Sequence, residues 1–496
     1  MRGLVAHLGL LFALVGASVA LNSDSPKEVC EELEEEYEGT VFYPGSKTYA
    51  DENKSYWTPT DYSSPACVFV PTCASQVAGA VEILADSDTK FAVRGGGHMP
   101  IPGYANTNGG VLIGFTKLNE IKLSANKATV SVGPGQRWGD VYKYLEPEGL
   151  VVLGGRVGLV GVPGLLLGGG ISFYSNQHGF ASDNVVAFDV VLASGKLVTA
   201  TATKYSDLFW ALKGGGNSFG IVTRFELTTF SSPKVCAGIL QIPGTARDQF
   251  LDAVASFAKD GSKDAKAAVI PSIFMLRKLG MTVYTSALFY DGEECKQPAL
   301  ANFTALPALM KTYGPTTLAK YVASTDALIG PGTRQYFQVV STLATLEALE
   351  IVHDTFVEGV KSKLWGIWDL QASIAFQPVT KQFIEAGVKK GGNPQGVDAS
   401  KAPYFWMVQN FSWDKSDDDK LISDACASIT AEINTKLEAV GQKADYQYMN
   451  DAGEGQQVFQ NYGPGNLATL KKIRQKYDPD RLFTDAMEGG WKVESA

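Results

Sequence analysis

The sequence predicts an α+β protein built from two domains of different architecture. Two observations support this expectation. Three glycine-rich loops lie at strand ends in the first half of the chain, at 94–98, 164–171 and 214–220, and such loops become rare after about residue 233. Glycine turns at strand ends let a backbone approach a ligand closely and expose its amides to anions. The longer strands and helices beyond residue 233 indicate a second domain built in another way.

The first elements alternate between helix and strand. An acidic helix is expected over 26–37, because its apolar residues recur on one face. A strand at 68–70, a helix at 75–84 and a strand at 91–93 then imply a right-handed parallel crossover. The further expected elements are strands at 111–113 and 128–132, a helix at 138–145, a hairpin over 185–200, a helix at 206–212, a strand at 221–227 and a C-terminal helix at 466–477.

Composition limits the function. A chain of 496 residues, 45% hydrophobic and 19% charged, can bury an ample core and is typical of a globular protein with a polar surface. A net charge of −9 argues against nucleic acid or an anionic membrane surface as a partner. No segment after the first twenty residues is apolar enough to span a bilayer. We therefore expect a monomer that acts on small molecules.

The N-terminus is typical of a secretory signal peptide. A positive start at 1–2, an apolar run at 8–15 and small residues at 18–20 predict cleavage after Ala20 and a secreted protein, the alternative being an uncleaved anchor. Three acceptor triplets for N-glycans agree with that route, and they begin at Asn53, Asn302 and Asn410.

The six cysteines are widely spaced, and no CxxC pair exists. A zinc site is therefore unexpected, and we predict no metal site. In an oxidising compartment, Cys30 could form a disulfide with Cys67 or Cys73 and tie the N-terminal helix to the first domain. The sequence leaves these two pairings open.

Two common motifs are excluded by their context. Residues 216–220 fit G-x-S-x-G, but a hydrolase nucleophile needs a strand before the Ser and a helix after it, and here the order is reversed. No G-x-G-x-x-G opens a helix, and no P-loop is present. A long, phosphate-bearing cofactor must therefore be held by the loop at 94–98 and by the backbone of the later glycine loops.

In this order, the motifs resemble those of the FAD-linked oxidases of the vanillyl-alcohol oxidase and p-cresol methylhydroxylase class, especially the fungal berberine-bridge-enzyme-like branch. Residues 93–98 resemble the pyrophosphate loop with its flavin-linking histidine. Residues 161–185 resemble the central FAD-binding run, and 207–223 the end of that domain. Residues 446–450 and 477–479 resemble the C-terminal cap.

The resemblance implies a two-subdomain FAD-binding domain of the vanillyl-alcohol oxidase type and an α+β substrate domain. After a signal peptide at 1–20, the implied limits are 21–233 for the FAD domain, 234–445 for the substrate domain and 446–496 for a segment that returns to the FAD domain. It also implies FAD joined to His98 by a single covalent link. The expected cofactor-binding residues are Arg94, Gly95, Gly96, Gly97, His98, Val162, Gly164, Gly168, Gly169, Gly170, Asn184, Ile221, Tyr448 and Asn450.

The chain departs from the family pattern twice. Many members attach FAD a second time through Cys in a Cys-Pro-Thr-Val-Gly run, and here residues 157–161 are Val-Gly-Leu-Val-Gly, which predicts no second link. Several relatives have Tyr after the Tyr-x-Asn motif, and this chain has Asp451. We expect Asp451 and Tyr448 to be catalytic, with Asp451 as a base whose pKa is raised by burial; the alternative is an outward turn residue. Val162 resembles a position that gates oxygen.

These inferences predict a secreted FAD-dependent oxidase that removes a hydride from a small alcohol, amine or allylic C–H group, with oxygen reduced to hydrogen peroxide. Fungal specialised metabolism is the expected setting. The alternatives are a carbohydrate oxidase and a flavoprotein scaffold that catalyses a cyclisation without net redox. A sugar site needs several hydrogen-bonding groups, so Tyr448, Trp406 and Gln371 would separate these readings if they faced the flavin.

Overall fold

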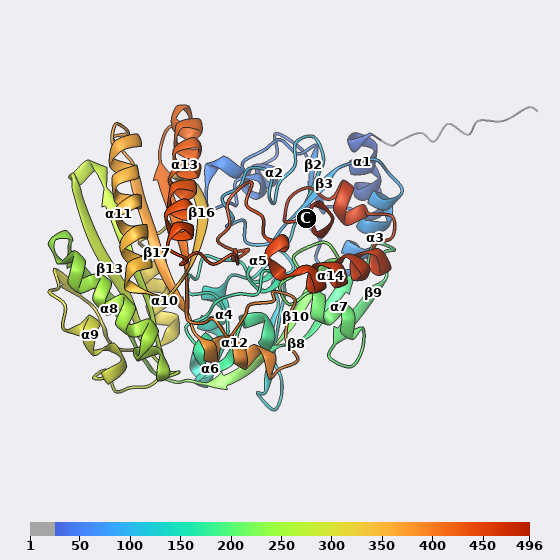
Figure 1. The fold of residues 1–496 in the computed structure, drawn as a ribbon. Helices are drawn as coiled ribbons and strands as arrows, with labels where there is room; N and C mark the ends of the chain where they lie inside the picture. Colours follow the sequence, from blue (N-terminus) through green and yellow to red (C-terminus); the bar gives the residue numbers. More distant parts are fainter. Residues whose placement is uncertain (1–24) are drawn as a thin grey trace, which may run out of the picture.

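The computed structural model describes residues 25–496, so the predicted signal peptide lies outside the described residues. Within this range the strands form three sheets, two in the N-terminal part and a larger one in the second half of the chain (Figure 1). The α+β class predicted from the sequence is confirmed.

The first sheet begins the chain. Strands β2 and β3 both pair in parallel with β4, which lies between them, and α3 (Ala74–Ala85) connects them, so the predicted parallel arrangement is confirmed. Helix α1 (Pro26–Glu36) is tied to this sheet by the Cys30–Cys67 disulfide, which settles the pairing that the sequence left open. In spatial order the strands are β1 (Val41–Phe42), β2 (Cys67–Phe69), β4 (Val111–Gly114) and β3 (Phe91–Arg94), and helix α2 (Lys47–Asn53) follows β1.

The second sheet is antiparallel and includes the predicted hairpin, β8 with β9. The short helix α5 (Val162–Leu167) forms within the glycine-rich run 154–170, because Pro163 suits its first turn and three consecutive glycines follow its end. The strands are β5 (Ile121–Leu123), β6 (Thr129–Val132), β10 (Ile221–Ser231), β8 (Val185–Val191) and β9 (Leu197–Thr201), with β7 (Leu150–Val152) beside β10; the helices are α4 (Trp138–Leu145), α6 (Ser175–His178) and α7 (Ser206–Ala211).

The third sheet has eight strands and carries helices on its outer face, where α11 (Leu346–Lys363) and α13 (Asp419–Ala439) lie side by side (Figure 1). The strands are β14 (Met310–Lys311), β11 (Val235–Pro243), β13 (Met281–Tyr290), β12 (Ala267–Leu276), β17 (Gln371–Val379), β18 (Tyr404–Trp413) and β16 (Arg334–Leu343), with β15 (Gly314–Thr316) beside β11; the other helices are α8 (Arg247–Lys259), α9 (Ala301–Thr304), α10 (Leu318–Asp326) and α12 (Lys381–Val388).

Strand alternation decides which side chains of this sheet reach the rest of the molecule. Successive side chains of a strand point to opposite faces. In β17, Ile374 and Phe376 belong to the apolar core beneath the outer helices, whereas Ala375 and Gln377 point to the opposite face. That inner face lies toward the N-terminal part, so the sheet acts as a roof over it.

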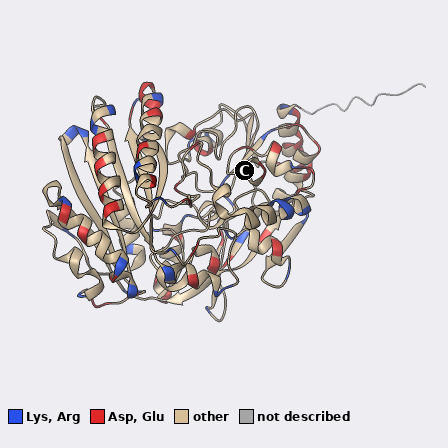
Figure 2. Ribbon diagram, in the orientation of Figure 1, with Lys and Arg blue, Asp and Glu red and all other residues tan. Residues whose placement is uncertain are grey.

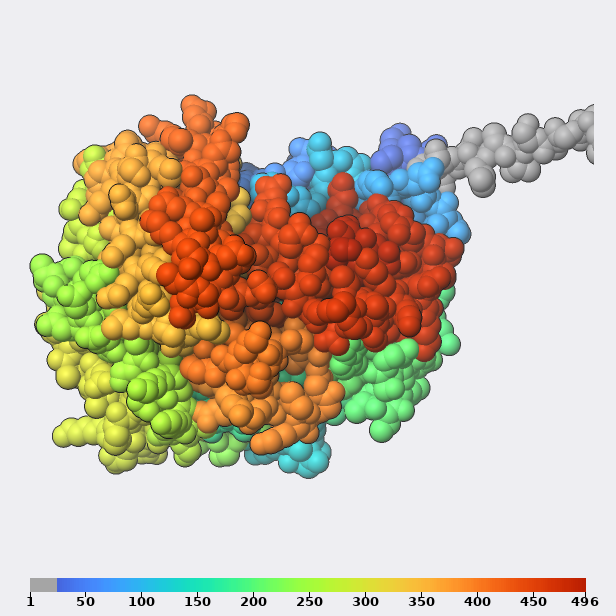
Figure 3. Space-filling model, viewed as in Figure 1, coloured from blue at the N-terminus to red at the C-terminus, as the bar shows by residue number. Residues whose placement is uncertain are grey.

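The C-terminal segment returns to the N-terminal part and covers one face of it (Figure 3). It contains α14 (Pro464–Tyr477), the Tyr462 hydroxyl donates to the Gly214 carbonyl at 2.8 Å, and Met487 forms an isolated bridge with Phe91. All strands of the third sheet lie between Val235 and Trp413. We therefore retain, as a proposal, the domain limits near residues 233 and 445.

The surface carries both signs of charge, and both occur on α11 and α13, with the lysines of α11 confined to its last turn (Figure 2). A second disulfide joins Cys236 to Cys295, whereas Cys73 and Cys426 are free thiols. Over residues 25–496, none of the helices has the length and apolar character needed to cross a membrane.

Candidate active site

A cavity of about 400 Å³ lies between the N-terminal part, the third sheet and the C-terminal segment. This volume is in the range of pockets that bind small molecules. The loop at 95–99, the run 155–168, residues 216–222 and residues 448–451 form its walls. Ile270 of β12, Phe337 of β16, Ala375 and Gln377 of β17, and Val408 of β18 form its roof.

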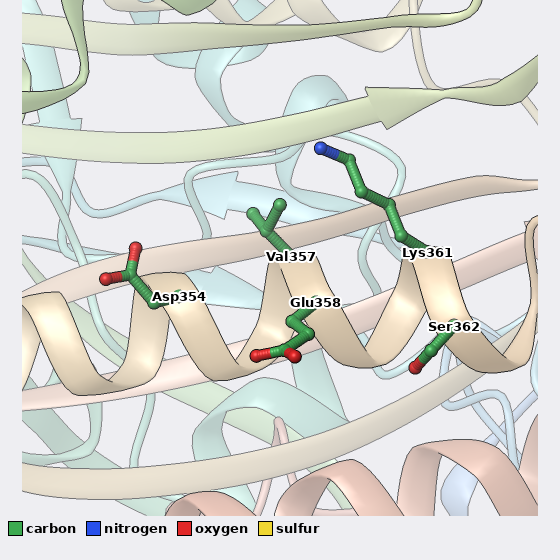
Figure 4. Close-up of a pocket in the computed structure, with 5 residues that line it drawn as sticks. All are labelled: Asp354, Val357, Glu358, Lys361 and Ser362. Carbon is green, nitrogen blue, oxygen red and sulfur yellow. The ribbon is translucent and has the colours of Figure 1, made fainter.

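An open hollow of about 470 Å³ runs along the outer face of α11 (Figure 4). Its lining side chains, Asp354, Val357, Glu358, Lys361 and Ser362, all come from that one helix. In the described part of the chain, the one carboxylate of this hollow with a partner on another element, Asp354, is already paired with Arg247 of α8, so we do not regard the hollow as a candidate site.

The glycines form a backbone cradle at one wall of the cavity. A Cβ atom on Gly96 would lie 2.4 Å from Gly161 Cα, and one on Gly95 would lie 2.4 Å from Pro163 Cγ. A Cβ on Gly168 would lie 2.1 Å from Asn450 Oδ1. Only glycine allows these close approaches, and the result is a wall with exposed backbone groups, suited to an extended, phosphate-bearing ligand.

His98 ends the loop with a free ring nitrogen. Its Nε2 atom is buried without a hydrogen-bond partner, and its ring stacks on Trp57 with 4.3 Å between centroids. Burial, assisted by the positive charge of Arg137, lowers the pKa of His98 to about 3, so the imidazole is neutral. A neutral imidazole with an unpartnered nitrogen beside a glycine cradle fits the attachment of FAD at this position.

Asp451, Gln377 and Arg156 form a connected polar group in the same cavity. The Gln377 side-chain amide donates to Asp451 Oδ2, and the Arg156 guanidinium donates to Gln377 Oε1. Burial raises the pKa of Asp451 to about 6, although the Gln377 hydrogen bond and the Arg156 charge oppose the rise. A carboxylate with this pKa is suited to take a proton near neutral pH.

Tyr448 is fixed from several sides. Its hydroxyl oxygen accepts from the Ile171 backbone N–H at 2.9 Å and from the Asn450 side-chain amide at 3.0 Å. Trp406 stacks on its ring, with 5.6 Å between centroids. Burial, and the nearby charge of Asp451, raise the pKa of Tyr448, so the phenol keeps its proton and can donate it into the cavity.

Most of the predicted site residues line the cavity. Arg94 does not, because its guanidinium pairs with the Glu52 carboxylate beneath the loop. Its charge is therefore compensated by the chain itself and supports the loop. The predicted residues that line the cavity are Gly95, Gly96, Gly97, His98, Gly164, Gly168, Ile221, Tyr448, Asn450 and Asp451.

The other predicted residues lie behind the cavity wall. The Asn184 side chain donates to the His178 and Phe180 carbonyls and accepts from Lys390, so it holds a loop together. Gly169 and Gly170 have φ values of 95° and 85°, which suit the turn after α5. Val162 is fully buried in the core, whereas Val160, two residues earlier, lines the cavity.

The two roof residues chosen to separate substrate classes also lie elsewhere. Trp406 is fully buried between Tyr446 and Tyr448. Gln371 is exposed at the start of β17, about 20 Å along the strand from Gln377. The roof residue with a polar side chain is instead Gln377, which no sequence pattern indicated.

Sequence reasoning also missed Arg156 and Trp57. Arg156 stands alone among the eight glycines of 154–170, and an isolated charge in such a run could have been noticed. Trp57 had no signal, since its role follows from tertiary stacking on His98. Among residues 25–496, no cluster of three or more His, Cys, Asp or Glu side chains is arranged to hold a metal ion.

Comparison with known proteins gives concordant results. A family model described as an FAD binding domain matches residues 65–201. The chain is 36% identical to an FAD-dependent monooxygenase of Penicillium roqueforti, over 98% of this chain and 97% of that protein. It is 30% identical to the bifunctional solanapyrone synthase of Alternaria solani, over 94% and 88% of the two chains.

Solved structures share the fold at lower identity. The 6-hydroxy-D-nicotine oxidase of Arthrobacter nicotinovorans superposes with a TM-score of 0.74 at 21% identity, over 90% of this chain and 96% of that one. The glucooligosaccharide oxidase of Acremonium strictum, which is described as carrying a 6-S-cysteinyl, 8α-N1-histidyl FAD, gives 0.75 at 18% identity, over 92% and 99%.

Proposed function

The chain belongs to the FAD-linked oxidoreductases of the vanillyl-alcohol oxidase and p-cresol methylhydroxylase class, in the berberine-bridge-enzyme-like branch, and on that premise we propose that it is an oxidase of a small organic substrate. The observation that carries the proposal is one cavity that contains both the unpartnered His98 nitrogen and the Asp451 carboxyl, whose pKa is raised to about 6.

The residues of the chain take distinct roles. FAD bound in the cavity would supply the hydride acceptor and pass the electrons to oxygen, which gives hydrogen peroxide. The glycine cradle would hold its phosphates, and His98 would anchor it by one covalent link. Asp451 would accept the substrate proton, and Gln377 holds that carboxylate in place.

The roof supports a small, largely apolar substrate over an oligosaccharide. Ile270, Phe337, Ala375 and Val408 present apolar surface, and Gln377 brings the one polar side chain among the described roof residues. A sugar site needs several hydrogen-bonding groups, and this roof offers few. The cavity therefore favours an oxidase of a small molecule of specialised metabolism over a carbohydrate oxidase.

A second candidate is monooxygenation, which the names of several relatives favour. The two reactions differ in the fate of oxygen. Active substrates are first identified by anaerobic bleaching of the flavin. With each of them, we expect one molecule of hydrogen peroxide per molecule of substrate oxidised, and no incorporation of isotopically labelled oxygen gas into the product. Incorporation of the label, with little peroxide, would support the monooxygenase instead.

Covalent attachment gives a direct prediction. The yellow colour should stay with the polypeptide after acid precipitation, because a covalent bond survives unfolding. His98→Ala should release all its flavin into the acid supernatant. Mass spectrometry of the intact protein should show the mass of one FAD in the wild type only. Free flavin in the wild-type supernatant would contradict the proposed link.

Oxygen access gives a second prediction. Because Val160 lines the cavity and Val162 does not, we assign the gating role to Val160. Val160→Leu should slow reoxidation of the photoreduced enzyme by oxygen about tenfold or more. Val162→Leu is the control: it overpacks the core and lowers the thermal midpoint, but should leave the oxygen rate unchanged. If Val160→Leu and the wild type were reoxidised by oxygen at equal rates, the proposed gating role of Val160 would be wrong.

We also propose passage through the secretory pathway. The disulfides Cys30–Cys67 and Cys236–Cys295 support it, since such bonds persist in oxidising compartments. Of the glycan acceptors, Asn302 is exposed and donates one hydrogen bond, to Ser256, whereas the Asn53 side chain is half-buried and bonded to both Ser63 and Asn106. Asn302 is therefore the favoured glycan site.

A further inference from the structure

Arg156 is held in the cavity by the loop that carries it. Cβ atoms on Gly154 and Gly155 would lie 2.1 and 2.7 Å from atoms of the Trp138 indole, so both glycines lie flat against that ring. The Tyr142 hydroxyl donates to the Gly155 carbonyl at 2.7 Å. The backbone before Arg156 is thus fixed on two sides, and its side chain reaches the β17 roof at Gln377.

The Arg156 guanidinium is under-used by the chain. It has five N–H donors, and within residues 25–496 its one hydrogen-bond acceptor is Gln377 Oε1. It forms no ion pair with any described carboxylate, although Asp451 is near enough to stabilise its charge. Arg156 and Asp451 are the charged side chains among the cavity-lining residues. A half-buried guanidinium with free donors in an apolar cavity is a site for an oxygen that bears negative charge.

We propose that Arg156 binds the reacting oxygen of the substrate, and that the substrate is therefore an alcohol, phenol or enol rather than an amine. This inference rests on the proposed function and narrows its substrate class. An amine near neutral pH is a cation, which the Arg156 charge would repel inside a medium of low dielectric constant.

The proton and charge balance supports this assignment. In the oxidation of a secondary alcohol, R₂CH–OH to R₂C=O, the O–H proton would go to the Asp451 carboxylate, and FAD bound in the cavity would supply the acceptor for the C–H hydrogen and its two electrons. As Asp451 becomes neutral, negative charge develops on the substrate oxygen. If that oxygen lies at Arg156, the guanidinium is near the Asp451 carboxylate before the proton moves and near the negatively charged substrate oxygen afterwards. Until the hydride leaves, the charge of Arg156 is therefore balanced, first by Asp451 and then by the substrate oxygen.

The test uses the flavin-loaded protein and three ligands with the same ring: benzoate, benzamide and benzylamine. Perturbation of the flavin absorbance reports binding without turnover. We expect benzoate to bind the wild type at least about tenfold more tightly than benzylamine, in line with the strength of charge-assisted hydrogen bonds. Arg156→Gln should lower the affinity for benzoate by about tenfold or more, and its affinity for benzamide should stay within about threefold of the wild-type value.

Two further variants separate charge from packing. Arg156→Lys keeps the charge and should restore part of the benzoate affinity. Asp451→Asn removes the nearby negative charge and should tighten benzoate binding. The proposal is overturned if benzoate does not bind the wild type, if benzylamine binds more tightly, or if Arg156→Gln leaves benzoate affinity unchanged.

Substrate turnover gives an independent test of the Arg156 assignment. Anaerobic bleaching of the flavin should occur with benzylic and allylic alcohols and not with the amines of the same skeletons. Bleaching by the amines alone would overturn the Arg156 assignment while leaving the oxidase proposal intact. A failure of oxidase function would instead show as slow reoxidation of photoreduced wild type by oxygen, a measurement that does not involve Arg156.

Discussion

Asp451→Asn is expected to slow substrate-driven bleaching of the flavin by about two to four orders of magnitude, the usual contribution of a general base. The amide keeps the size and shape of the carboxyl, and its oxygen can still accept the hydrogen bond that the Gln377 side-chain amide donates. It cannot take a proton. The measurement is single-turnover, anaerobic stopped flow at saturating substrate, with flavin content read from the absorbance of the same samples.

The pH dependence supplies a second readout. The folded-state pKa of Asp451 is raised to about 6, and the ionised form is the base, so the wild-type bleaching rate should fall as pH drops below about 6 and level off above it. In Asp451→Asn, this fall in the bleaching rate at low pH should be absent. Because the pKa of Asp451 is higher in the folded than in the unfolded state, ionisation of Asp451 lowers the stability of the fold as the pH rises from the unfolded-state pKa through about 6. At pH 8, Asp451→Asn should therefore be at least as stable as the wild type.

Asp445→Asn is the matched control, because Asp445 is exposed on the same segment, outside the cavity lining. Its bleaching rate and pH profile should match those of the wild type. A change of less than about fivefold in Asp451→Asn would assign the base elsewhere. Tyr448 would then be the next residue to vary, since its hydroxyl lines the same cavity, although its raised pKa disfavours the phenolate that a base requires.

Local motifs made the FAD-binding part predictable. The loop at 94–98, the run 161–170 and the segment 446–451 each carry their chemistry in adjacent residues, so their resemblance to motifs of the family indicated them. The parallel first sheet followed from the alternation of strand and helix. A glycine that faces a ligand and a glycine that only forms a turn look alike in sequence, however. Gly168 lines the cavity, whereas Gly169 does not.

The polar group around Asp451 could not be predicted in this way. Arg156 and Gln377 are 221 positions apart, and their contact depends on how the third sheet is placed over the FAD-binding part. Arg94 is the opposite case. Its sequence position suggested a charge for the cofactor phosphates, but Glu52, 42 positions earlier, pairs with that charge beneath the loop. Long-range pairing decided both outcomes.

Gly96→Ala is expected to remove most of the bound flavin and to destabilise the protein. The new Cβ would lie 2.4 Å from Gly161 Cα and 2.5 Å from Gly161 N, and neither backbone atom can turn aside as a side chain would. The two loops must separate, at a cost of about 1–3 kcal/mol or more for overpacking. Flavin per polypeptide should fall below about a tenth of the wild-type value, and the thermal midpoint should fall with it.

Two other glycines test whether the flavin loss comes from the clash or from the cofactor itself. Gly465 of α14 lies outside the cavity lining, and a Cβ atom on it would have no atom within 4 Å, so Gly465→Ala should change neither stability nor flavin content. A Cβ on Gly164 also meets no protein atom, but it points from a residue that lines the cavity. Gly164→Ala should therefore keep its thermal midpoint, because alanine favours the α5 helix, and still lose flavin. If Gly96→Ala retained full flavin content, the contact between the loops at 96 and 161 would not be what shapes the cofactor site.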